Sequence, residues 1–191
     1  MPRISKELVI TAPADAVWQV LGPGFARIGE WATAIPSSTA IPATGAVPPV
    51  PPAPTGGPTP SRRSAVAGMV DAPVAGRVCT TGLRMVPEVT ETLVAYDEAN
   101  RSLTYEASGM PAFVTTARNT WTVTPLGDER CRVTLDARFD TSGVVGGFAR
   151  RLLLAQVGRT SRHLADDLRH YVEHGAPSTR KQRQLARRRQ P

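Results

Sequence analysis

VPEVTETLVAY, residues 86–96, begins the stretch that decides how this chain folds. Three more strand-like segments follow, at residues 102–108, 114–124 and 131–139, and turn-forming residues separate each segment from the next. Strands at this spacing predict an antiparallel meander. Residues 146–173 then form one long amphipathic segment, so the meander must bury its apolar face against that helix.

The residues before the meander predict a first strand, two short helices and further strands. Residues 3–11 alternate apolar and polar side chains, and residues 12–21 and 25–31 have the apolar spacing of short helices. Residues 37–41 and 77–81 are plausible further strands. We therefore expect an α+β fold in which a curved antiparallel sheet wraps around the long C-terminal helix.

A proline-rich insertion interrupts this order between residues 42 and 73. Ten of the chain's 18 prolines lie from Pro36 to Pro73, and proline removes backbone donors and excludes helix and central strand. We expect a mobile, extended loop inserted into a single domain that spans residues 1–175. Its VPPVPP segment, residues 47–52, resembles a ligand of proline-recognising domains, although a tolerated insertion is the simpler interpretation.

The net charge of +7 is concentrated at the C-terminus. Residues 176–191 hold six basic side chains and no acidic one, so the rest of the chain has a net charge of only +1. This imbalance, with Leu185 as the only sizeable apolar residue, predicts a disordered basic tail. Weak, nonspecific contact of this tail with nucleic acid or anionic membrane is an open alternative.

We expect no segment of this sequence to direct the protein into or across a membrane. No apolar run reaches the roughly 18 residues of a membrane span, and the N-terminus has no signal-peptide core. We therefore expect a soluble, cytoplasmic protein. Cys79 and Cys131 match no metal-ligand spacing, and we expect two buried free thiols in preference to a disulfide.

The order of elements resembles the helix-grip fold of the SRPBCC superfamily. That group includes START lipid-transfer domains, birch-pollen-allergen-like proteins and polyketide cyclase/dehydrase proteins. VITAPADAVW, residues 9–18, looks like the family's first strand and helix, and residues 25–31 look like its second helix, which usually ends in a Trp near the cavity mouth. Residues 89–105 are similar to its central hairpin. The resemblance implies an internal cavity for a small ligand, and the bias towards Arg, Ala and Pro is typical of an actinobacterial protein.

Alternation along the strands sorts the side chains that should face the long helix. Most of these side chains are apolar, but the polar residues Glu91, Tyr105 and Asn119 lie on the same strand faces. A polar group on a buried face needs a partner, which is either a ligand's oxygen atom or another polar group of the protein. Plain packing is the alternative for the aromatic residues. The residues we expect to contact a ligand are Trp31, Glu91, Tyr105, Asn119, Trp121, Phe139 and Leu152.

The candidates for catalysis are few. Glu91, Tyr105 and His163 are weak candidates for acid–base chemistry. His170 and His174 are four residues apart and could bind a metal ion only if a third ligand joined them. Nucleotide-binding and nucleophile-elbow motifs are absent. We therefore expect no metal and no cofactor.

Two functions of different classes fit these observations. The first is binding of a small hydrophobic ligand of lipid, polyketide or quinone type in the cavity. The second is a polyketide cyclase/aromatase-like enzyme, which would act mainly by positioning its substrate in the same cavity. Neither requires an obligate protein partner. A third possibility is an interaction protein that uses the basic tail, and the sequence leaves all three open.

Overall fold

We describe the protein from a computed structural model whose described backbone comprises residues 3–43, 72–83, 86–111, 113–141 and 147–188. The side chains of residues 83, 141, 147–159 and 161 lie outside this description. Most of the expected proline-rich insertion, residues 44–71, also lies outside the described residues.

The centre of the fold is one open, seven-stranded antiparallel sheet in the order β1-β7-β6-β5-β4-β3-β2. This arrangement confirms the expected α+β class and the antiparallel meander, which runs from β4 to β7. The strands are β1 (Arg3–Ile10), β2 (Ser37–Ile41), β3 (Gly76–Leu83), β4 (Val86–Asp97), β5 (Ser102–Ser108), β6 (Val114–Pro125) and β7 (Cys131–Thr141).

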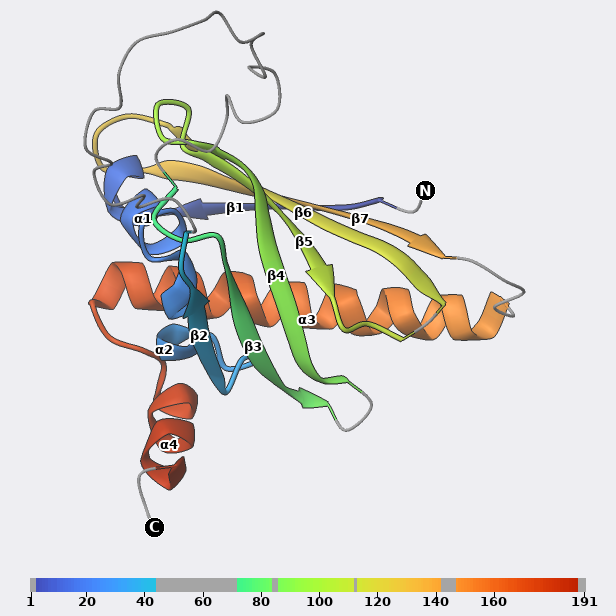
Figure 1. Ribbon diagram of the computed structural model, residues 1–191. Coiled ribbons are helices and arrows are strands. Elements are labelled where there is room, and N and C mark those ends of the chain that lie inside the picture. The colour runs from blue at the N-terminus through green and yellow to red at the C-terminus, as the bar shows by residue number, and fades with distance from the viewer. Residues whose placement is uncertain (1–2, 44–71, 84–85, 112, 142–146, 189–191) are drawn as a thin grey trace, which may run out of the picture.

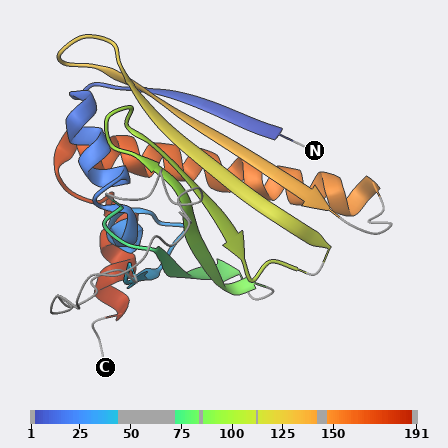
Figure 2. The same cartoon turned by 45° about the horizontal axis from the view of Figure 1, so that its top comes forward.

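The helices lie on one side of this sheet (Figures 1 and 2). The long helix α3 (Gly147–His174) runs behind the strands in Figure 1. The short elements α1 (Ala14–Leu21), η1 (Phe25–Arg27) and α2 (Ile28–Trp31) lie near its C-terminal end, and α4 (Thr179–Arg188) follows it. No helix in the described part of the chain is long and apolar enough to cross a membrane.

Strand alternation explains which face of the sheet is buried. On β5, Leu103 and Tyr105 are buried, whereas Thr104 and Glu106 lie on the other face. Thr104 is hydrogen-bonded to Thr120 of β6 at 2.9 Å, and Glu106 forms an ion pair with Arg118. The outer face is therefore covered by polar cross-strand pairs, while the inner face packs on the helices.

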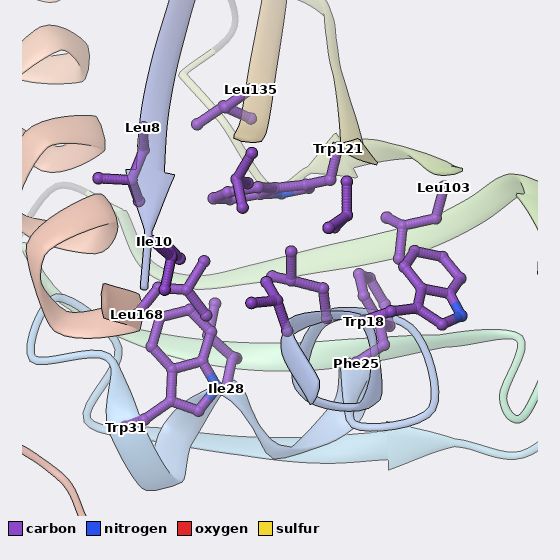
Figure 3. Close-up of a cluster of buried hydrophobic side chains, with 14 of the residues drawn as sticks. Leu8, Ile10, Trp18, Phe25, Ile28, Trp31, Leu103, Trp121, Leu135 and Leu168 are labelled. Carbon is purple, nitrogen blue, oxygen red and sulfur yellow. The ribbon is translucent and has the colours of Figure 1, made fainter. Parts of the chain in front are cut away.

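The main core joins the inner face of the sheet to the helices (Figure 3). From the helical side, Trp18, Ile28, Trp31 and Leu168 are all buried. The other labelled side chains of this core are Leu8, Ile10, Phe25, Leu103, Trp121 and Leu135. Cys79 and Cys131 are buried free thiols, as expected.

The helix α2 lies directly against β2, and a glycine makes this possible. A Cβ atom added at Gly29 would lie 2.6 Å from the backbone nitrogen of Ser38. The backbone N–H of Gly29 donates to Ser38 Oγ at 2.9 Å, and that hydroxyl donates to the carbonyl oxygen of Ala26 at 2.6 Å. The side chain of Ser38 therefore ties α2 and η1 to the edge of the sheet.

The C-terminal segment corrects one expectation. We expected residues 176–191 to be a disordered basic tail, but Thr179–Arg188 forms the helix α4. Lys181 of this helix is fully buried, and its ammonium group donates to the backbone carbonyl oxygen of Ile35 at 2.7 Å. The helix is ordered because the folded domain supplies acceptors that the isolated segment lacks.

Candidate ligand site around Arg77

A buried arginine lies at the centre of the candidate site. Arg77 is on β3, and the register places it directly opposite Glu91 of β4. Only 4% of Arg77 is exposed, and lone charged side chains are almost never buried this fully. A buried guanidinium group therefore requires partners close by.

Three groups hold the guanidinium of Arg77 in place. Its Nε donates to Glu91 Oε2 at 2.5 Å, and its Nη1 donates to the backbone carbonyl oxygen of Phe25. The guanidinium carbon also lies 3.8 Å from the centre of the Phe25 ring, which is a cation–π contact. These two bonds use Nε and Nη1, and the electrostatics of the cluster also include a hydrogen bond between the guanidinium and the Cys79 thiol. A guanidinium has five N–H donors, so the group could also donate to a further acceptor.

Electrostatics keep this cluster in defined protonation states. Burial is the largest single influence on Arg77 and lowers its pKa, but the charge and hydrogen bond of Glu91, together with Tyr105 and Cys79, raise the pKa by more, so the guanidinium stays charged. Burial, with the charge of Glu91, raises the pKa of the Tyr105 phenol and raises the pKa of the Cys79 thiol to about 12. Tyr105 and Cys79 are therefore neutral at physiological pH, and Cys79 does not supply a thiolate nucleophile.

A small cavity lies next to Arg77. It is lined by apolar side chains and by the guanidinium, and its volume of about 10 Å³ is room for about one water molecule. The lining residues are Val20, Leu21, Phe25, Ile28, Trp31, Arg77 and Trp121. Within the described residues the interior around Arg77 is therefore closely packed, without the large open cavity that the resemblance implies.

A second pocket lies on the other side of Trp31. Its volume is about 90 Å³, and Val20 and Trp31 line both this pocket and the inner cavity. The Trp31 ring is buried and stacks on Tyr171 of α3, with ring centres 6.5 Å apart. Its indole nitrogen Nε1 has no hydrogen-bond partner within the described part of the chain. Trp31 and Val20 thus form the partition between the two spaces.

The structure brings several of the sequence candidates to this cluster. Trp31 and Trp121 line the inner cavity. Glu91 bonds to Arg77, and the Tyr105 ring centre lies 5.4 Å from the guanidinium carbon. Asn119 is the cross-strand partner of Tyr105 and is half-buried.

The remaining candidates lie elsewhere. Phe139 belongs to a separate buried cluster with Ala117 and Ala137. His163 is exposed on α3, and the side chain of Leu152 is outside the described residues. In the part of the chain that the structure describes, no three His, Cys, Asp or Glu side chains gather closely enough to hold a metal ion.

Comparison with known proteins now identifies the family. The sequence matches the family described as polyketide cyclase / dehydrase and lipid transport over residues 1–173. The chain belongs to this family. No protein of curated function matches the sequence.

Solved structures similar to this family member share its fold at low sequence identity. The Zhui aromatase/cyclase from Streptomyces sp. R1128 is 16% identical with a TM-score of 0.61, over 93% of this chain and 99% of that one. A START superfamily protein from Mycobacterium smegmatis is 15% identical with a TM-score of 0.60, over 91% and 99%. The di-domain ARO/CYC BexL is 16% identical with a TM-score of 0.64, over 91% of this chain and 47% of that one.

Arg77, the central residue of the candidate site, was not identified from the sequence. In the sequence it is one basic residue at the start of a short strand. Its partner Glu91 is identified only by the register of β3 on β4, which is irregular between Thr80 and Leu83. One feature of the sequence could have predicted the burial of Arg77. Arg77 and Cys79 are two residues apart and lie on the same face of the strand, and Cys79 was expected to be buried.

Proposed function

We propose that this chain binds a small, largely apolar molecule and that Arg77 binds an oxygen atom of that molecule. The observation that carries this proposal is a charged guanidinium, a group with five N–H donors, at the wall of an otherwise apolar cavity. Ligand sites are typically apolar with a few orienting polar groups. A carbonyl, enolate, phenolate or carboxylate oxygen would suit such a donor.

Entry of the ligand would require Trp31 to move. Small-molecule sites usually have volumes of roughly 300–1,000 Å³, and the inner cavity has about 10 Å³. Rotation of the Trp31 indole would join this cavity to the 90 Å³ pocket beyond it, and neighbouring lining side chains would also have to move, because the two spaces together hold only about 100 Å³. The unpaired Nε1 of Trp31 favours this role, because no hydrogen bond within the described residues holds the ring in its closed position.

A catalytic role in the same site is the second candidate, and the Arg77–Glu91–Tyr105 cluster favours it. A fixed guanidinium stabilises negative charge that develops on a carbonyl oxygen, as in enolate formation or ring closure. The neutral phenol of Tyr105 could donate a hydrogen bond to the same oxygen. The family description, which includes both cyclase/dehydrase and lipid transport, is compatible with either role.

The test is binding of 8-anilinonaphthalene-1-sulfonate, an apolar aromatic anion whose fluorescence rises on binding. We expect Arg77→Met to weaken its binding by about tenfold or more, because a charge-assisted hydrogen bond is lost. Arg77→Lys keeps the charge but not the planar fork, and should have an intermediate effect. Arg118→Met is the matched control, since Arg118 is exposed on the outer face of the sheet.

Equal affinity for the wild type and the folded Arg77→Met variant would show that the probe does not use this site. Native mass spectrometry of the purified protein would then separate the two roles. An unmodified apolar ligand that co-purifies supports binding or transport, whereas conversion of an added polyketone to a cyclised product supports catalysis.

A further inference from the structure

The segment from Ala32 to Pro36 connects the partition residue Trp31 to strand β2. Its backbone groups are held by side chains of α3 and α4 instead of by a regular element. The N–H of Thr33 donates to Asp167 Oδ2 at 2.6 Å, and the carbonyl oxygen of Thr33 accepts from Gln184 Nε2 at 3.3 Å. Two distant parts of the chain thus fix this one short segment.

Lys181 holds the same segment from inside the protein. Its ammonium group donates to the carbonyl oxygens of Ile35 at 2.7 Å and Pro36 at 3.4 Å, and to Gln184 Oε1 at 2.9 Å. An ammonium group has three donors, so this set of acceptors satisfies it completely. Arg188 adds a bond from Nη1 to the Pro36 carbonyl oxygen at 2.7 Å.

Asp167 links the start of α4 to these contacts. Its Oδ1 accepts from the hydroxyl of Ser178 at 3.2 Å, while its Oδ2 accepts from the Thr33 backbone. Asp167 is almost fully buried, and so is Ala32. The loop before α4, the helix α3 and the Trp31 segment therefore meet at a single carboxylate.

Helix α4 lies outside the part of the chain that matches the family. The family match ends at residue 173, and α4 begins at Thr179. In Figure 1, α4 lies beside α2 and β2, beyond the C-terminal end of α3. The contacts of Lys181, Gln184 and Arg188 therefore come from a helix that lies beyond the family match.

We propose that α4 is a clasp on the Trp31 segment and that Lys181 and Asp167 are positioning residues that set how fast a ligand enters and leaves. This inference rests on the proposed function, because it assumes that Trp31 moves to admit a ligand. The contacts of the clasp are made to the closed segment. Releasing them should lower the barrier to opening without touching the ligand itself.

The experiment compares two charge reversals on α4 in the full-length protein. Lys181→Glu puts a carboxylate against three acceptor oxygens, which should detach the helix from the segment. Arg183→Glu makes the same charge change on an exposed position of the same helix and is the matched control. Stopped-flow binding of 8-anilinonaphthalene-1-sulfonate and hydrogen exchange of residues 32–35 are the two readouts.

We expect Lys181→Glu to raise the association and dissociation rate constants by a similar factor, about fivefold or more, with the Kd changed less than about twofold. Amide exchange at residues 32–35 should rise at least about tenfold, while exchange in β6 and β7 stays at the wild-type rate. Arg183→Glu should match the wild type in every measurement. If Lys181→Glu unfolds the domain, Arg188→Glu takes its place, with a smaller expected effect in the same direction.

Equal rates and equal exchange in Lys181→Glu and Arg183→Glu would overturn the clasp. Failure of the proposed function looks different, because Arg77→Met would then bind the probe as the wild type does. In that case exchange at residues 32–35 still decides whether α4 holds the segment.

Discussion

At the scale of single residues, the pair Arg77–Glu91 is an ion pair inside the protein. Removing two charges from water is costly, and a buried ion pair often stabilises a protein no more than an apolar pair of similar volume. Here the cost is offset by the bond to Glu91, the bond to the Phe25 carbonyl oxygen and the cation–π contact. Because these contacts can account for the burial, it is the position of Arg77 in the cavity wall that favours a role in ligand recognition.

Cys79 allows the electrostatics of this cluster to be tested through pH. In the folded protein, burial and Glu91 raise the pKa of Cys79 to about 12, from an ordinary value of 9.0. Above pH 9 the unfolded chain releases the thiol proton while the folded chain keeps it, so stability falls as pH rises. The loss due to Cys79 should be about 2 kcal/mol near pH 10.5.

Urea unfolding of the wild type and Cys79→Ala measures this loss. The difference in unfolding free energy between the two proteins should be constant below pH 8. Between about pH 9 and 10.5 the unfolding free energy of the wild type should fall relative to that of Cys79→Ala. Cys131→Ala is a useful control, because Cys131 is also buried but has no carboxylate among the causes that raise its pKa. A difference that does not change with pH would mean that the thiol of Cys79 is not shielded as the structure indicates.

At the scale of elements, the sequence predicts the strands and helices that have a local pattern, either the alternation of a strand or the periodicity of a helix. The seven strands, the two early helical segments and the long helix follow from local patterns in the chain. The helix α4 does not, because six basic charges and one sizeable apolar residue give no local reason to fold. Its stability comes from acceptors at Ile35 and Pro36, which are brought to Lys181 only by the tertiary structure.

The same distinction applies to the candidate site. Trp31, Trp121 and Tyr105 could be selected from the sequence because aromatic residues on inward faces are visible in the pattern. Arg77 could not, because its burial depends on a cross-strand partner in β4. The small volume of the inner cavity depends on how side chains from α1, η1, α2 and β6 fill the same space, which no single segment encodes.

Gly29 tests how α2 is held against β2. Gly29→Ala would place a Cβ atom 2.6 Å from the Ser38 nitrogen, which is too close for either backbone to tolerate. We expect a loss of about 1–3 kcal/mol in unfolding free energy, as for overpacked sites. Gly82→Ala is the matched control, because nothing lies within 4 Å of a Cβ atom at that position. Thermal or urea unfolding measures both, and equal stability of the two variants would contradict the close approach.

At the scale of the whole molecule, the charge is distributed very unevenly. The C-terminal segment holds six of the 23 basic residues and no acidic one. Lys181, Gln184 and Arg188 of α4 face the domain, whereas Arg180, Arg183 and Arg187 are exposed. Those three are spaced three and four residues apart, which places them on one side of a helix. The folded α4 thus presents an arginine face, in place of the disordered tail that the sequence predicts.

This arginine face should bind anionic surfaces, and anionic lipid vesicles are the direct test. Removing Arg180, Arg183 and Arg187 by Gln substitution should weaken partitioning onto phosphatidylserine vesicles by about fivefold for each arginine, or on the order of 100-fold for all three. Raising the salt concentration should weaken the binding of the wild type steeply and the binding of the triple variant little.

A control that changes Arg118, Arg132 and Arg138 to Gln removes the same charge from the exposed face of the sheet. Two of these control residues already pair with Glu106 and Glu7, so it should partition as the wild type does. Equal loss in both triple variants would assign any binding to net charge alone, and binding to RNA but not to vesicles would assign the face to nucleic acid.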